Sequence, residues 1–216
     1  PELVISLDDV TNVLCFNEST GEIQITVSGG VMPSEGYYFT WTGTTFQGMT
    51  FNSFVEDLSA LKAGTYSLTV RDANGCSAVL PPVTITQPVE LTVVTESITN
   101  VECFDESTGA VDITVTGGTV PAGGYLFSWT GMDYSGNVFT GNTEDLEDMK
   151  AGTYMLTVTD ANNCSVTLPA VNITQPPVLN VSVISQTDVL CFGESTGTIS
   201  VSVTGGTMPS GGYYYD

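Results

Sequence analysis

The sequence predicts an all-β protein made of antiparallel β-sandwich domains repeated in tandem. Three observations support this fold class. Cysteines recur at a fixed period, because Cys15, Cys103 and Cys191 are each 88 residues from the next. Within each repeat, apolar and polar residues alternate with a period of two, which is typical of half-buried strands and not of helices. Each full repeat also contains one tryptophan within an aromatic strand pattern, which can anchor a core.

Short motifs recur with the same period and define the repeats. They are CFNESTG, CFDESTG and CFGESTG at 15–21, 103–109 and 191–197, KAGTY at 62–66 and 150–154, and ITQP at 85–88 and 173–176. We therefore predict three domains, at 1–90 (core 3–90), 91–178 and 179–216. The last is the first part of a third repeat, since it stops before its own KAGTY motif, so we expect a longer array of which this chain is a part.

The alternation places four strands of the first repeat in chain order. Their inward-facing residues are Ile23, Ile25 and Val27, then Tyr37, Phe39 and Trp41, then Tyr66, Leu68 and Val70, and last Val83 and Ile85. Turns are expected at Gly29-Gly30 and at 72–75, because Gly, Asn and Asp favour chain reversal. The second repeat copies this register, including the stripe of Tyr125, Phe127 and Trp129.

Each repeat is long enough to close a core of its own. A solenoid repeat of about 20 to 50 residues cannot bury its apolar face alone, whereas 88 residues with a tryptophan and two cysteines can. About seven short strands around a central tryptophan favour an immunoglobulin-like sandwich. The connections at 87–88 and 175–177 are short and contain proline, so we expect limited hinge motion and a semi-rigid rod.

The cysteines predict disulfides within each repeat. Cys15 and Cys76 have the same 61-residue separation as Cys103 and Cys164, so we pair Cys15 with Cys76 and Cys103 with Cys164. The partner of Cys191 would follow the end of the chain. Buried free thiols of a cytosolic protein are the alternative, but the acidic, lysine-poor repeats favour an exported protein. Zinc is not expected, because two thiols per repeat and no histidine fall short of four ligands.

The charge excludes several classes of partner. The 216 residues contain three cations, no histidine and 24 carboxylates, for a net charge of -21. Such a surface repels nucleic acid and anionic lipid, which need a basic patch. No apolar stretch approaches the roughly 18 residues of a membrane span, and no signal peptide is visible at the amino terminus, so we expect no direct membrane insertion.

The acidic motifs at 72–75 and 160–163 are best explained as turns, with calcium binding as the alternative. The oxygen ligands that could converge on calcium are Asp8, Asp9, Glu18, Asp72 and Asn74. Neither an EF-hand loop nor a calcium-binding nonapeptide supports such a site. We therefore predict no metal site and no cofactor, and keep calcium as the open alternative.

Catalysis is not expected. The carboxylate pairs Glu56-Asp57 and Glu144-Asp145 could supply an acid and a base, but adjacent residues on a strand point to opposite faces. The sequence also has no histidine base, no Gly-rich phosphate loop and no activated serine or cysteine motif.

The ordered motifs CFxESTGxIxIxVxGG, Tyr-x-Phe-x-Trp, KAGTYxLTVxDANxC and VxITQP resemble the SprB repeat of very large cell-surface adhesins from gliding Bacteroidetes. The resemblance covers both full repeats and the beginning of the third. It implies an immunoglobulin-like domain, an extracellular location after type IX secretion, and a filament that grips external surfaces. The segments at 44–61 and 132–149 are longer than in the familiar repeat, so binding by these loops could differ.

Two functions are compatible with these observations, one structural and one in ligand binding. The first is a structural stalk of an adhesin or filament, and the alternative is a carbohydrate-binding array that multiplies weak contacts. The stripe of Tyr37, Phe39 and Trp41 could stack on sugars, but its strand spacing favours the core. The segments 44–61 and 132–149 keep only some aromatics in equivalent places, which favours the stalk. Expected partners are neighbouring repeats, and surface polysaccharide or other adhesin chains.

Overall fold

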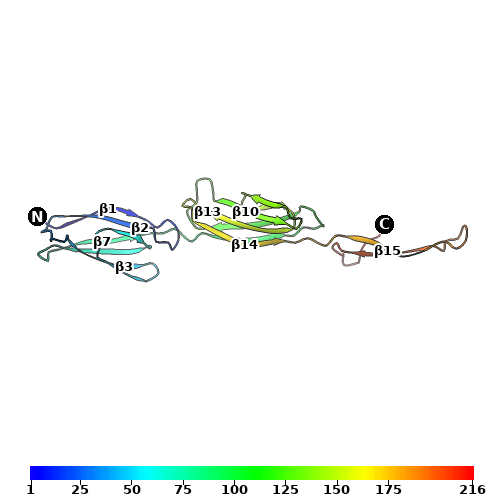
Figure 1. The fold of residues 1–216 in the computed structure, drawn as a ribbon, viewed down its shortest axis with the longest axis horizontal. Helices are drawn as coiled ribbons and strands as arrows, with labels where there is room; N and C mark the ends of the chain where they lie inside the picture. The colour runs from blue at the N-terminus through cyan, green and yellow to red at the C-terminus, as the bar shows by residue number, and fades with distance from the viewer. The chain divides into compact units, whose positions relative to one another are not determined.

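The computed structural model describes residues 1–216 and contains sixteen strands (Figure 1). In the first repeat these are β1 (Val4–Thr11), β2 (Gly21–Ser28), β3 (Tyr38–Thr45), β4 (Thr50–Ser53), β5 (Leu58–Leu61), β6 (Gly64–Arg71) and β7 (Ser77–Ile85). In the second they are β8 (Thr92–Thr99), β9 (Gly109–Thr116), β10 (Leu126–Asp133), β11 (Val138–Gly141), β12 (Leu146–Met149), β13 (Gly152–Thr159) and β14 (Ser165–Ile173). The third contributes β15 (Asn180–Thr187) and β16 (Thr198–Thr204). No helix in the structure is long and apolar enough to cross a membrane.

The first two repeats have the same pair of sheets. Residues 1–90 form a three-stranded sheet in the order β1-β2-β5 and a four-stranded sheet in the order β4-β3-β6-β7, with antiparallel pairing. The second repeat has the corresponding orders β12-β9-β8 and β11-β10-β13-β14. The predicted fold class, tandem immunoglobulin-like antiparallel β-sandwiches, is confirmed.

The core of the first repeat lies where the alternation predicts it. Ile23 is fully buried and Ile25 nearly so, while Gln24 between them faces outward. Trp41 is 0% exposed, and its indole Nε1 donates to the carbonyls of Val55 and Glu56 at 3.0 and 3.2 Å. A buried tryptophan needs such an acceptor for its N–H. The assignment of this stripe to the core is confirmed, although Tyr37 and Phe39 are only partly buried.

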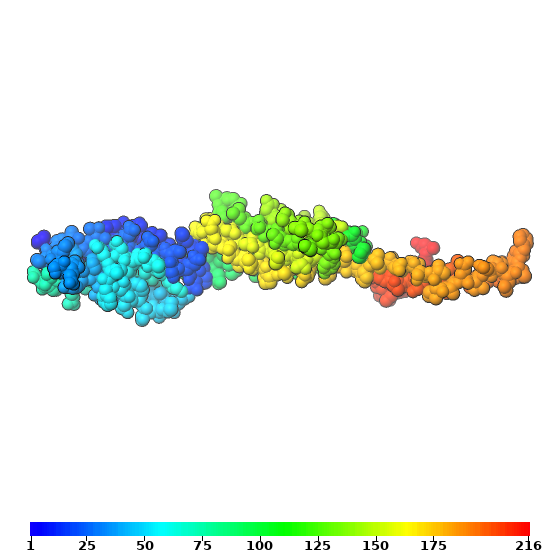
Figure 2. All heavy atoms as spheres, in the orientation of Figure 1, coloured from blue at the N-terminus to red at the C-terminus, as the bar shows by residue number.

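The third repeat is described by one antiparallel pair, β15 with β16. Its apolar side chains are not covered by a second sheet, and Val183 and Ile199 are more than half exposed. In Figure 2 the atoms of this part, coloured orange to red, form a thin layer.

The chain divides into two compact units that do not follow the sequence repeats. The first consists of Pro1–Thr92, Thr116–Tyr125 and Thr159–Ser165, and the second of Val93–Val115, Leu126–Val158 and Val166–Asp216. The first unit takes in short segments of the second repeat because they bind residues of the first repeat. Each of the five sheets nevertheless draws all its strands from one repeat. The domain boundaries 1–90, 91–178 and 179–216 stay a prediction.

Replacing Gly117 with Ala should destabilise the fold by more than about 1 kcal/mol. Gly117 has a φ of 81°, and a Cβ atom there would lie 1.8 Å from the carbonyl oxygen of Glu90. The matched control is Gly123→Ala, because Gly123 has an ordinary φ and open space around it. Urea unfolding should show a change within about 0.5 kcal/mol for the control. Equal stability of the two variants would contradict this account of the Gly-Gly turn.

Candidate functional site

A disulfide between consecutive repeats is the most distinctive chemical feature of the structure. Cys15 is bonded to Cys164, 149 residues further along the chain, with a Cα–Cα distance of 5.6 Å. Cys15 lies in the loop between β1 and β2, and Cys164 in the turn between β13 and β14. Both cysteines belong to the first compact unit.

The loop that holds Cys15 is built from two of the repeated motifs. The Thr20 hydroxyl, from the ESTG motif, accepts the amide of Leu14 at 2.9 Å. The Gln87 side-chain oxygen, from the ITQP motif, accepts the amide of Asn17 at 3.0 Å. Val13 is buried just before the loop, where its amide donates to a carbonyl of the ITQP motif at 2.9 Å. The two motifs therefore fix the backbone on both sides of Cys15.

The turn that presents Cys164 is organised by the buried carboxylate of Asp160. This side chain is 2% exposed, and its Oδ1 accepts the amides of Asn162 and Cys164, both at 2.9 Å. Its Oδ2 accepts the amide of Thr119 at 2.8 Å. The prediction that the Asp-Ala-Asn motif forms a turn is confirmed, and the turn is fastened to the segment after β9.

Further polar contacts surround the disulfide. The Asn162 Nδ2 donates to the Leu14 carbonyl at 2.8 Å and to the Thr119 hydroxyl at 3.0 Å. Residues close to the two cysteines thus bond to each other, so the contact does not depend on the sulfur atoms alone. Sequence periodicity gave no sign of this contact, because it joins different motifs of different repeats.

The structure contains neither of the predicted disulfides. Cys76 and Cys103, the proposed partners of Cys15 and Cys164, are free and exposed, as is Cys191. The correction has a topological reason: five strands, β2 to β6, separate Cys15 from Cys76. An odd number of reversing strands puts the two cysteines at opposite ends of the sandwich. An eight-residue strand spans about 26 Å, whereas a disulfide tolerates a Cα separation of about 4.4–6.8 Å.

The residues considered for calcium are not brought together. Asp8 accepts the Thr26 hydroxyl at 2.6 Å on the β1–β2 sheet, and Asp9 accepts that of Thr11 at 3.3 Å. Glu18 lies in the loop that holds Cys15, whereas Asp72 lies at the other end of the repeat. No group of three or more acidic or thiol side chains in residues 1–216 is placed to hold a metal ion.

The two carboxylate pairs considered for catalysis have structural contacts instead. Asp57 accepts the amide of Ile25 at 2.9 Å, and Asp145 accepts the equivalent amide of Ile113 at the same distance. These bonds fasten the segment before β5 or β12 to the neighbouring β2 or β9. These hydrogen bonds therefore engage one carboxylate of each pair, Asp57 in the first repeat and Asp145 in the second.

Acidification should remove the stabilising effect of Asp72. This side chain is 4% exposed and accepts the amides of Val31, Asn74 and Cys76 at 3.1, 2.9 and 2.8 Å. Burial alone would raise its pKa, but the amides of Val31, Cys76 and Asn74 lower it below the ordinary 3.8. A lowered pKa means that the stabilisation is present above pH 3.8 and is lost as the pH falls through the folded-state pKa.

Asp72→Asn provides the test of this pH dependence. The difference in the free energy of unfolding between the unmodified chain and the variant should shrink as the pH is lowered below about 4. Urea titrations at several pH values measure it. A difference that stays constant down to acid pH would show that the Asp72 charge is unimportant.

Comparison with known proteins gives a family match and several structural neighbours. The model of the SprB repeat matches residues 7–46, 95–133 and 183–216. Among solved structures, the three N-terminal domains of the bacteriophage RB49 highly immunogenic outer capsid protein (Hoc) are 18% identical, with a TM-score of 0.41. That match covers 97% of this chain and 72% of the other. Among the curated proteins compared with the chain, none matches it.

Proposed function

Because this chain belongs to the SprB-repeat family of cell-surface adhesin repeats, we propose that it is a segment of a structural stalk. In this role the repeats give an adhesin reach, while other parts of the protein bind the target. The proposal extends to export by type IX secretion and to service in gliding motility. A disulfide supports an oxidising, extracellular environment.

The bond between Cys15 and Cys164 is the observation that carries the proposal. It joins consecutive repeats in parallel with the backbone that runs through Gln87 and Pro88. A second covalent connection of this kind adds nothing to a catalytic or ligand site, but it limits how far the two repeats can separate under tension. A stalk needs that property.

Only some of the exposed aromatics keep their place from one repeat to the next, which leaves the carbohydrate-binding alternative few candidate platforms. Tyr38 and Phe54 are 58% and 74% exposed in the first repeat. The residues 88 positions later are Leu126 and Asn142, which cannot stack on a sugar ring. The two tryptophans are buried in the cores. An array that used one sugar site per repeat would keep its aromatic platform in each repeat. Only two exposed aromatic positions, Phe46 with Tyr134 and Phe16 with Phe104, recur at the 88-residue interval in the two full repeats and could serve as such a platform.

External proteolysis of intact cells tests the location and the covalent connection together. Protease added outside the cell should release this chain, and non-reducing peptide mapping of the released material should find Cys15 bonded to Cys164. Release only after cell lysis, with all thiols reduced, would overturn the proposal. A binding assay separates the alternative: saturable binding of the purified chain to surface polysaccharide, lost when Phe46 and Tyr134 are both replaced with Ala, would favour the sugar-binding array.

A further inference from the structure

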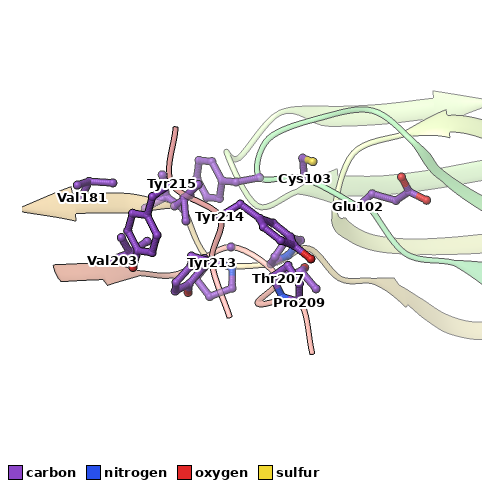
Figure 3. A pocket seen from close by; sticks show the side chains of 15 residues that line it. Glu102, Cys103, Val181, Val203, Thr207, Pro209, Tyr213, Tyr214 and Tyr215 are labelled. Atoms are coloured by element: carbon purple, nitrogen blue, oxygen red, sulfur yellow. The ribbon is translucent and has the colours of Figure 1, made fainter. Parts of the chain in front are cut away.

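A cavity lies beside Cys103, the cysteine that follows Cys15 by one repeat. It has a volume of about 690 Å³ and is lined on one side by Cys103 and Phe104. Thr207 and the side chains of Tyr213 and Tyr214 line it on another side, as Figure 3 shows. The Cys103 thiol is free and exposed. All of these residues belong to the second compact unit.

Part of the lining of this cavity matches residues near the disulfide already described, and the rest includes apolar residues of the third repeat such as Leu179, Val181 and Val203. Cys103 and Thr207 follow Cys15 and Thr119 by 88 residues each. Tyr213 follows Tyr125 by the same interval, and both hydroxyls donate to the first glycine of their Gly-Gly turn, at 2.5 and 2.7 Å. The Gly-Gly turn beside the cavity is therefore folded like the one beside Thr119, and the Cys103 loop repeats the backbone-amide hydrogen bonds of the Cys15 loop.

Around the Cys15–Cys164 disulfide, the residues equivalent to this lining bind the Asp-Ala-Asn-Asn-Cys turn at 160–164. Thr119 donates its amide to Asp160, and its carbonyl accepts the amide of Ala161 at 2.9 Å. Asn162 bonds to the carbonyl before Cys15, and Cys164 bonds to Cys15 itself. The chemistry that recognises the turn is thus an amide and a carbonyl from one repeat, and a carbonyl and a thiol from the repeat before it.

We propose that the cavity beside Cys103 receives an Asp-Ala-Asn-x-Cys turn whose thiol forms a disulfide with Cys103. The occupant is the turn of the repeat to which Thr207 belongs, so the first cysteine of each repeat pairs with the second cysteine of the next. Cys76 is exposed in a turn of the same kind and takes the first cysteine of a preceding repeat. This inference deepens the proposed stalk function and rests on it, because it extends one bond to a ladder of bonds along an array.

The oxidation balances by thiol–disulfide exchange. Cys103 and the incoming cysteine each lose one proton and one electron as their sulfur atoms join. A small disulfide, such as oxidised glutathione, accepts the two electrons and two protons and leaves as two thiols. Mixed disulfide formation at one thiol precedes attack by the other.

Completing the third repeat tests the pairing directly. In the extended chain, a copy of residues 129–178 follows residue 216. This copy supplies the missing KAGTY motif and second cysteine at the positions that the 88-residue period requires. After oxidation in glutathione buffer, non-reducing peptide mapping should find the added cysteine bonded to Cys103, with Cys15 still bonded to Cys164. Bonding of the added cysteine to Cys191 would overturn the proposal. So would a Cys103 that stays free in the folded, oxidised chain.

A peptide experiment on the unextended chain keeps the proposal testable if the longer chain does not fold. The probe is a synthetic peptide of residues 159–165, activated as a mixed disulfide with a small thiol. Three exposed thiols compete for it, and it should label Cys103 severalfold faster than Cys191 or Cys76. The matched control peptide carries Asp160→Ala and should lose this preference. Equal labelling of the three thiols by both peptides would overturn the proposal.

These outcomes are distinguishable from a failure of the stalk function. If Cys103 does not receive the turn while Cys15 and Cys164 remain bonded, the ladder is absent and the stalk keeps its one cross-connection. If Cys15 and Cys164 are also found reduced in protein released from cells, the stalk proposal fails as well.

Discussion

The variant Cys15→Ser should extend about 500 Å further under force than the oxidised, unmodified chain. With the disulfide intact, residues 16–163 form a closed loop that cannot lengthen when the two ends of the chain are pulled. The variant frees this loop, and each unfolded residue contributes about 3.3–3.6 Å. Single-molecule stretching between protein handles at the two termini measures the difference.

The matched control for this experiment is Cys76→Ser, because Cys76 is exposed and unbonded. Its maximal extension should equal that of the oxidised, unmodified chain. Reduction with dithiothreitol should lengthen the unmodified chain and leave Cys15→Ser unchanged. Equal extension of oxidised chain and Cys15→Ser would show that the Cys15–Cys164 bond does not form in solution.

Replacing Trp41 with Ala should cost about 3–5 kcal/mol of the stability of the first sandwich. The side chain is fully buried, and its removal leaves a cavity and takes the indole donor from two carbonyls. Because every sheet of the second repeat uses only its own strands, that repeat should keep its stability. Trp129 is then the only tryptophan, and its fluorescence in a urea titration reports on the second repeat alone.

Two measurements control the Trp41→Ala result. Far-ultraviolet circular dichroism follows the loss of the first sandwich, which Trp129 fluorescence does not detect. The variant Tyr38→Ala, which changes an exposed aromatic on the same strand, should stay within about 0.5 kcal/mol of the unmodified chain. Simultaneous unfolding of both repeats in Trp41→Ala would contradict the separate cores.

The sequence alone is sufficient to predict the strands that have one buried face and one exposed face. β2 and β6 alternate strictly, and their buried residues are those that the period of two selects. The alternation predicts β7 only around Val83 and Ile85, whereas the strand begins at Ser77 and includes Pro81 and Pro82. The strand continues through both prolines because they lie at a bulge of an edge strand, where neither has a partner in β6 and a missing backbone donor is tolerated.

The disulfide partner could not be obtained from spacing. A separation in sequence does not say at which end of a sandwich a cysteine lies, since each additional strand moves it to the other end. The four-residue strands β4 and β5 carry little pattern, so the strand count is uncertain by one or two from sequence alone. The Cys15–Cys164 contact also requires packing between consecutive repeats, which a pattern that is identical in every repeat does not encode.

The loop closed by Cys15 and Cys164 gives the chain tolerance to proteolytic damage. Phe54 and Val138 are examples of exposed side chains within that loop where an extracellular protease can cut. A single cut between residues 16 and 163 opens the loop, yet both pieces stay attached through the sulfur atoms. A nicked molecule therefore remains continuous from one end to the other, and reduction is needed before the pieces separate.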